Sequence, residues 1–122
     1  MSTRPVLIID DDPRNVFALT AVLRAKGYQA LSAPGAAEGI ELLQQQPGIG
    51  MVLMDMMMPE MDGYEAVTEI RRLEEGKTIP IIAVTAQAMV GDRERCLAAG
   101  ADDYLSKPVD VDALVRLLKT YL

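Results

Sequence analysis

The stretch Met51-Val52-Leu53-Met54-Asp55 is a short apolar run, typical of a buried β-strand, that stops at a carboxylate. Three further apolar runs stop at polar residues in the same way: Val6-Leu7-Ile8-Ile9 before Asp10-Asp11, Ile81-Ile82-Ala83-Val84 before Thr85-Ala86, and Tyr104-Leu105-Ser106 before Lys107-Pro108. In a parallel α/β sheet such ends lie side by side at the carboxyl edge, where these sheets bind ligands. The pattern therefore predicts three carboxylates, a hydroxyl and an ammonium at one site, a set that suits a divalent cation and a phosphoryl group.

Helical patterns separate the strand-like runs. Helices are predicted over about 13–26, 35–46, 63–75, 92–99 and 109–121, and the remaining strands over 29–32, 79–84 and 103–106. Their buried stripes are predicted to hold Val16, Leu19, Leu23, Ala36, Ala37, Ile40, Leu43, Ala66, Val67, Ile70, Leu73, Leu114, Leu117 and Leu118. Strands that alternate with helices predict a parallel α/β sheet with right-handed crossovers, in one domain over residues 1–122.

Composition excludes several classes of function. A formal net charge of −6 argues against nucleic acid as a direct partner, because phosphate binding needs a basic surface. The chain has no histidine, which removes Ser-His and Cys-His catalysis and histidine metal sites, so any metal must be held by oxygen ligands. Its one cysteine, Cys96, excludes an internal disulfide and fits the reducing cytosol, hence a cytoplasmic location. No long apolar stretch follows the N-terminus, so neither a signal peptide nor insertion into a membrane is predicted.

With these motifs in order, the chain resembles the receiver domains of two-component response regulators over essentially its whole length, and most of all those attached to hybrid histidine kinases. The segments that carry the resemblance are 6–11, the loop from Met54 to Gly63, Thr85-Ala86, Gly91-Asp92-Arg93-Glu94 and Asp102 to Pro108, with Asn15 after the acidic pair. The resemblance implies a doubly wound, flavodoxin-like (βα)5 sandwich of three layers, CheY-like, with strand order 2-1-3-4-5.

The resemblance also implies a role for each site residue. Asp55 would be the phosphoacceptor, acting as a carboxylate nucleophile toward phosphorus. Mg²⁺, or Mn²⁺ in its place, would be held by Asp10, Asp11, Asp55 and the backbone carbonyl of Met57. Lys107, Thr85 and Ala86 would bind the phosphoryl oxygens, and Lys107 would assist Asp55 in catalysis. A cis peptide bond is expected at Lys107-Pro108, where it would aim Lys107 at the site.

Some residues have simpler interpretations. Asp12 before Pro13 is a helix N-cap rather than a metal ligand. Cys96, next to Leu97 in a predicted helix, is a buried structural thiol rather than a nucleophile. Asp102 and Asp103 are a loop charge and a strand start. The methionines between Met51 and Met61 fill the core and pack loops better than they would serve a metal site.

Two other functions compete with the receiver. A haloacid dehalogenase-type phosphatase also forms an aspartyl phosphate, and Asp10-Asp11-Asp12 superficially fits its Asp-x-Asp motif. Arg14 opposes this reading, as does the lack of a segment for a substrate cap. The discriminating observation is whether Asp55 or Asp10 is phosphorylated. A flavin-binding module would need a Ser-, Thr- and Gly-rich phosphate loop after the first strand, where the aspartates would repel phosphate.

The receiver interpretation implies partners and a switch. The domain would take its phosphoryl group from a histidine kinase or a histidine phosphotransfer domain, and would catalyse only its own phosphorylation and dephosphorylation. The expected switch pairs Thr85 with Tyr104: Thr85 moves toward the phosphoryl group, and Tyr104 turns inward to fill the vacated space. A downstream protein would read the change on the face formed by the fourth helix, fifth strand and fifth helix.

Overall fold

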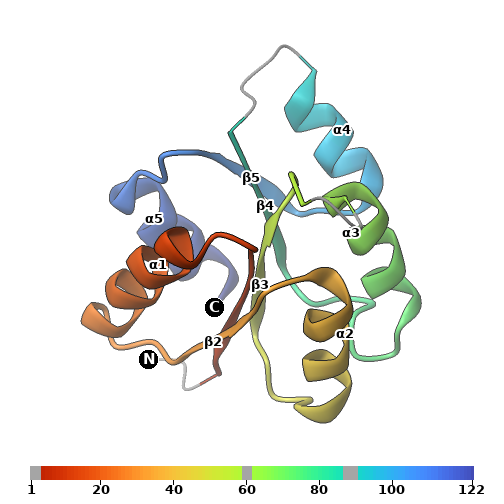
Figure 1. Ribbon diagram of the computed structural model, residues 1–122, viewed down its shortest axis with the longest axis horizontal. Helices are drawn as coiled ribbons and strands as arrows, with labels where there is room; N and C mark the ends of the chain where they lie inside the picture. The colour runs from red at the N-terminus through yellow and green to blue at the C-terminus, as the bar shows by residue number, and fades with distance from the viewer. Residues whose placement is uncertain (1–3, 59–61, 87–90) are drawn as a thin grey trace.

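The computed structural model describes residues 4–58, 62–86 and 91–122, in which strands and helices alternate five times (Figure 1). The strands are β1 (Val6–Ile9), β2 (Ala30–Ala33), β3 (Met51–Asp55), β4 (Ile81–Thr85) and β5 (Asp103–Ser106). The helices are α1 (Pro13–Ala25), α2 (Ala36–Gln45), α3 (Gly63–Arg72), α4 (Asp92–Ala99) and α5 (Val111–Tyr121). All strand pairs are parallel, in the order β2-β1-β3-β4-β5, which confirms the predicted doubly wound sheet.

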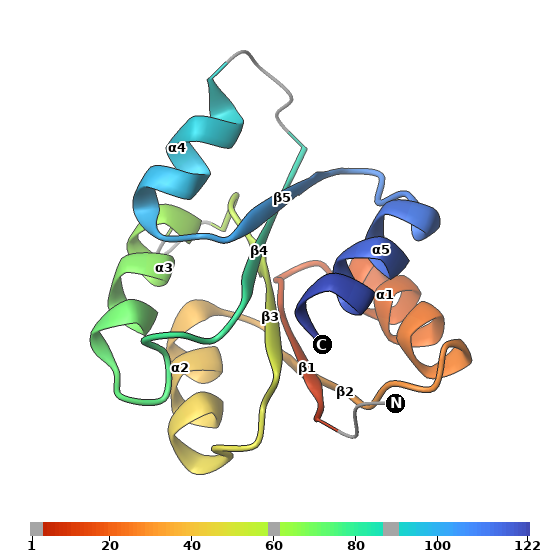
Figure 2. The same cartoon turned by 180° about the vertical axis from the view of Figure 1, so that it is seen from behind.

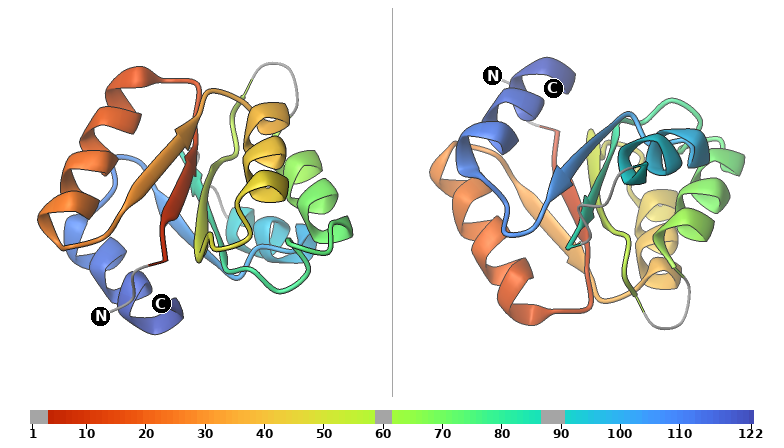
Figure 3. Two further views of the ribbon diagram at one scale, coloured as in Figure 1. Left: turned by 90° about the horizontal axis from the view of Figure 1, so that it is seen from below. Right: turned by 90° about the horizontal axis from the view of Figure 1, so that it is seen from above.

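Helices cover both faces of the sheet and complete a three-layer sandwich. Figures 1 and 2 show α1 and α5 on one face and α2, α3 and α4 on the other, and Figure 3 shows the same layers from below and above. Successive strand residues point to opposite faces, so Leu7 and Ile9 join the core under α2–α4, whereas Val6 and Ile8 join the core under α1 and α5. Because helices bury both faces of the sheet, most strand residues are apolar, which explains the continuous apolar runs in the sequence. Among the described residues, no helix has the length and apolar character needed to cross a membrane.

Aspartates begin three of the helices. The Asp12 carboxylate accepts the N–H of Arg14 at 3.0 Å, with Pro13 in the first turn, so its predicted capping role is confirmed. Asp62 caps α3 and Asp110 caps α5 in the same manner. Each cap satisfies a backbone N–H that has no partner within the helix.

Several predicted boundaries were wrong by a few residues. β2 lies one residue later than predicted. β4 begins at Ile81 rather than 79, because Pro80 has no N–H to offer a neighbouring strand, and it extends to Thr85. α3 ends at Arg72, before the predicted stop near Gly76. α5 begins at Val111 rather than 109, because Asp110 takes the N-cap position. The predicted turn over 59–63 lies partly outside the described residues.

The predicted core needs one correction at α2. Ala37 is exposed, and Gly39 is buried in its place. A Cβ atom on Gly39 would lie 2.3 Å from Cδ1 of Ile9, so α2 presses against β1 at this glycine and turns Ala37 outward. Four other members of the predicted stripes are half-buried rather than buried: Val16, Ile40, Leu73 and Leu117.

Candidate functional site

The parallel register brings the polar strand ends to one edge of the sheet. The N–H of Met56, just after Asp55, donates to the carbonyl of Val84 at 2.9 Å, and the N–H of Lys107 donates to that of Thr85 at 2.8 Å. Asp10, Asp11 and Asp55 each offer a carboxylate oxygen, and these oxygens lie within 4.8 Å of one another. The structure thus brings together the three acidic residues that the sequence placed at one site.

Lys107 lies against two of these carboxylates. Its Nζ is 3.4 Å from Oδ1 of Asp55 and 3.5 Å from Oδ2 of Asp10. Asp55 is 3 % exposed and accepts the N–H of Met57 on the same Oδ1 at 3.0 Å. One oxygen of Asp55 is therefore held by the backbone N–H and by the ammonium.

The two aspartates after β1 differ in their surroundings. Asp10 is also 3 % exposed; its Oδ1 accepts the N–H of Asp12 at 2.9 Å, and its Oδ2 accepts the side-chain amide of Asn15. Both oxygens of Asp10 are therefore engaged by protein donors. Asp11 is exposed at the rim, where it is accessible to a ligand.

Burial raises the pKa of Asp55, and the neighbouring charge of Asp10 raises it further. The N–H of Met57 and the ammonium of Lys107 act in the opposite direction, more weakly than burial does. The ionised site therefore holds more negative charge than one lysine compensates. A bound cation would relieve that excess.

The donor set fits a hard divalent cation. Three carboxylates within reach of one another are oxygen ligands of the kind preferred by Mg²⁺, Mn²⁺ and Ca²⁺, and the chain has no histidine to favour a softer metal. Thr85 is buried at the end of β4, and Ala86 follows it at the surface. The Lys107-Pro108 peptide bond is cis, as the resemblance implied.

The sequence-family model for the response regulator receiver domain matches residues 6–119 of the chain. The chain belongs to the receiver domain family. No finding supports the phosphatase or flavin alternatives, and in this receiver both oxygens of Asp10 already accept hydrogen bonds.

Curated relatives of this receiver include both short proteins and sensor kinases. It is 36 % identical over 117 residues to protein PilH of Pseudomonas aeruginosa and covers 96 % of each chain. It is also 40 % identical over 116 residues to the sensor histidine kinase RcsC of Escherichia coli. This alignment covers 95 % of the receiver but 12 % of the kinase. The match therefore says nothing of the rest of that kinase.

Solved receivers have the same fold. One is the receiver domain of a Pseudomonas aeruginosa sensor histidine kinase with a magnesium ion coordinated in its active-site cleft, at a TM-score of 0.89 and 38 % identity over 98 % of both chains. Another is the receiver domain of the response regulator Ssk1 of Saccharomyces cerevisiae, in complex with the histidine phosphotransfer protein Ypd1. Its TM-score is 0.88 at 28 % identity, over 98 % of this chain and 88 % of that one.

Sequence reasoning missed the role of Arg71 at the opposite edge of the sheet. Its guanidinium donates to the carbonyls of Gly76, Ile79 and Gly100 and to the carboxylate of Asp102. Asp102 also accepts the N–H of Ile81 at 2.8 Å, so it is a structural anchor rather than a simple loop charge. No local pattern indicates this pair, because its members lie 31 residues apart.

Tyr104 and Cys96 lie in the core region under α4. Cys96 is buried, as predicted, and burial raises the pKa of its thiol, which keeps it protonated and inert. Tyr104 is half-buried against the same core. Burial raises the pKa of its hydroxyl, and the Asp92 carboxylate raises it further.

Proposed function

We propose that this receiver is a phosphorelay switch in which Asp55 accepts a phosphoryl group from a phosphohistidine. The observation that carries the proposal is the buried Asp55 carboxylate at the end of the central strand, with Lys107 at 3.4 Å and two further carboxylates beside it. Family membership supports the reaction class. The domain would catalyse only its own phosphorylation and dephosphorylation.

In the proposed transfer, an Asp55 oxygen attacks phosphorus while the bond from phosphorus to the imidazole nitrogen breaks. The bonding pair returns to the imidazole, and the product is an aspartyl phosphate. Lys107 would exchange its contact with the Asp55 carboxylate for one with a phosphoryl oxygen. The Thr85 hydroxyl and the Ala86 N–H would donate to the other oxygens. Positioning and charge compensation are what such a transfer requires of the protein.

Asp10, Asp11, Asp55 and the backbone carbonyl of Met57 are the proposed Mg²⁺ ligands, with Mn²⁺ as a substitute. When bound, the cation would neutralise charge on the phosphoryl oxygens. Asp10 would act through water, because both of its oxygens already accept hydrogen bonds. Asp11 is exposed and would bind directly.

A protein donor would approach across the first helix. Phe17 on α1 is 77 % exposed, and a cleft of about 420 Å³ beside it is lined by Asp10, Asp11 and Val16. A donor that delivers phosphate to Asp55 must reach this rim, where Phe17 would supply apolar contact. The donor is proposed to be a histidine kinase or histidine phosphotransfer domain. We expect Phe17→Ala to slow transfer from such a protein and to leave labelling by acetyl phosphate unchanged.

The proposed output is the face formed by α4, β5 and α5, coupled to the site through Thr85 and Tyr104. Thr85 ends β4, and Tyr104 lies on the adjacent β5, paired with Ala83 in the register. A phosphoryl group adds charge and acceptor oxygens that draw the Thr85 hydroxyl toward Asp55. A cytoplasmic location is proposed with this role, supported by the buried free thiol of Cys96.

The decisive experiment is labelling with acetyl phosphate and Mg²⁺, followed by intact mass and peptide mapping. We expect one phosphoryl group on Asp55 and none on the Asp55→Asn variant. Asp10→Asn should reduce the rate of labelling but leave the label on Asp55. Stoichiometric labelling of Asp10 in the Asp55→Asn variant would instead support the phosphatase mechanism.

A further inference from the structure

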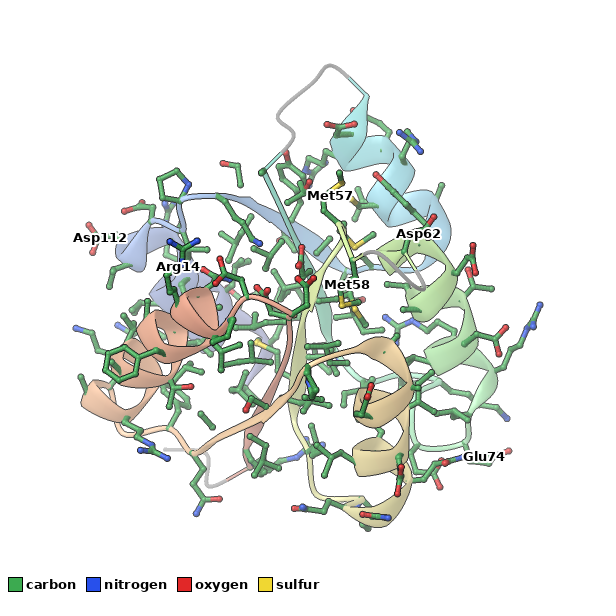
Figure 4. All side chains as sticks on the ribbon, in the orientation of Figure 1. Arg14, Met57, Met58, Asp62, Glu74 and Asp112 are labelled. Atoms are coloured by element: carbon green, nitrogen blue, oxygen red, sulfur yellow. The ribbon has the colours of Figure 1, made fainter. Side chains whose placement is uncertain are left out.

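Three consecutive methionines follow the candidate acceptor, and they differ sharply in exposure. Met56 is 1 % exposed and Met58 is 8 % exposed, whereas Met57 between them is 50 % exposed. Figure 4 shows Met57 beyond the end of β3, on the side of α4. Met51 and Met54 are also fully buried, so Met57 is the accessible thioether among the methionines that the structure describes.

The Met57 side chain lines a cleft that borders the acidic site. The cleft has a volume of about 630 Å³, and its other walls include Asp11, Tyr64 and Arg95. The Arg95 guanidinium lies over the Tyr64 ring, 4.6 Å from the ring centroid, which holds it at the cleft. A methionine, a candidate metal carboxylate and a positioned guanidinium therefore line the same cleft.

The backbone of Met57 is tied to the candidate acceptor. Its N–H donates to Oδ1 of Asp55 at 3.0 Å. The hydrogen bond fixes the Met57 backbone beside the reacting carboxylate, so a chemical change on this side chain occurs on a residue that contacts Asp55 directly. The two neighbouring methionines border the same cleft, but they are buried, so a solute should reach them much more slowly than it reaches Met57.

We propose that Met57 is an oxidation site that sets the lifetime of the phosphoryl group on Asp55; this rests on the proposed function of Asp55. A hydroperoxide transfers one oxygen atom to the Met57 sulfur, which loses two electrons and becomes a sulfoxide, while the peroxide is reduced to water or an alcohol. Met57 thereby changes from an apolar side chain to a polar one with a strong hydrogen-bond acceptor.

The surroundings of Met57 suit a sulfoxide. Arg95 lines the same cleft, and its guanidinium offers donors and positive charge that favour a sulfoxide oxygen there despite the carboxylate of Asp11. The same oxygen can accept a hydrogen bond from a water at the mouth of the site. That water is then held where it can attack phosphorus from the side opposite Asp55, so oxidation should accelerate hydrolysis of the aspartyl phosphate.

The test compares the wild type with Met57→Leu, which cannot be oxidised at this position, and Met57→Gln, which carries a permanent acceptor. Each is treated with hydrogen peroxide or buffer, labelled with acetyl phosphate, and followed for loss of label; the readout is the ratio of the two lifetimes within each protein. We expect peroxide to shorten the wild-type lifetime about fivefold, as one added hydrogen bond would. The ratio should be one for Met57→Leu, and untreated Met57→Gln should resemble the oxidised wild type.

Peptide mapping of the same samples gives an independent readout. Met57 should gain oxygen well before Met56 and Met58, which lie in the same peptide and serve as internal controls. Equal oxidation of the three, or an equal effect of peroxide on wild type and Met57→Leu, overturns the proposal. If wild-type Asp55 takes no label from acetyl phosphate, the proposed function fails, and so does the proposed effect of Met57 on the lifetime of the phosphoryl group. The peptide map shows separately whether Met57 is the methionine that peroxide oxidises first.

Discussion

Asp10 and Asp55 are buried beside each other, and the Lys107 ammonium contacts both carboxylates. Asp11 adds a third carboxylate at the rim. Like charges at such distances repel, and a cation bound to the folded state relieves the repulsion. At the scale of single residues, the metal-free site therefore costs stability, which ligand binding restores.

Mg²⁺ should raise the melting temperature of the wild type through this site. At ten times its dissociation constant the gain is about 1.4 kcal/mol, or roughly 3–6 °C for a domain of this size. The Asp11→Asn variant should show a much smaller shift in thermal unfolding followed by circular dichroism. Asp12→Asn is the matched control, since it removes a neighbouring charge but keeps a capping side chain. An unchanged Mg²⁺ shift in Asp11→Asn would exclude that residue as a ligand.

The raised pKa of Asp55 predicts a dependence of stability on pH. Burial favours the protonated form of this carboxyl in the folded state, so its ionisation costs stability at neutral pH and the cost disappears as pH falls through its pKa. Without metal, Asp55→Asn should therefore unfold at a higher temperature than the wild type at pH 7, and the difference should shrink under acid conditions. A variant less stable than the wild type at pH 7 would show that the Lys107 contact outweighs burial.

At the scale of elements, Arg71 joins three segments that are distant in sequence. From the last turn of α3, its guanidinium donates to the carbonyls of Gly76 and Ile79 before β4. It also donates twice to the carbonyl of Gly100, in the connection between α4 and β5. Gly100 has φ of +121°, a conformation that favours glycine and that turns the chain from α4 into β5. The geometry of the guanidinium, rather than its charge alone, holds these ends together.

Replacing Arg71 should therefore be costly. Arg71→Met keeps the aliphatic stem but removes the donor to the carbonyls of Gly76, Ile79 and Gly100 and the ion pair with Asp102, and we expect a loss of about 2–4 kcal/mol in the free energy of unfolding. Arg72→Met is the matched control: Arg72 is exposed and pairs with Glu69 one turn away, so its loss should cost below about 0.5 kcal/mol. Urea denaturation measures both, and similar losses would contradict the anchoring role.

At the scale of the whole molecule, the proposed signal must travel from Asp55 to the face of α4, β5 and α5. β3, β4 and β5 are consecutive neighbours in the sheet, so Thr85 at the site and Tyr104 on the proposed output face lie on adjacent strands. The Tyr104 ring is half-buried against the core that includes Cys96 of α4. A shift of Thr85 can therefore alter the packing of Tyr104 without unfolding any element.

Beryllofluoride, which mimics a phosphoryl group, should change the chemical shifts of Tyr104 in the wild type and much less in Thr85→Ala. The coupling free energy expected for such a switch is about 1–3 kcal/mol. Occupancy of Asp55 is checked in the same spectra from the signals of the adjacent residues. A Tyr104 environment that stays constant while Asp55 is occupied would exclude the switch and leave the acceptor role intact.

Local patterns in the sequence determined the alternation of elements, the aspartate caps and the set of polar residues at the strand ends. These features depend on periodicity and on neighbours a few residues away, which the sequence contains directly. The prediction of Asp12 as a cap and the bounds of β5 were confirmed for this reason. The family motifs, in order, are sufficient to indicate the receiver fold.

Tertiary structure alone decided which groups meet. The approach of α2 to β1 at Gly39, the Arg71 anchor and the exposure of Met57 between two buried methionines have no counterpart in local sequence pattern. Each depends on how closely two elements pack, and that distance is set by the combined fit of side chains from the whole core. The sequence predicted that Asp10, Asp55 and Lys107 share one edge of the sheet, but only the packing decides that both carboxylates are buried, which makes the charge excess costly.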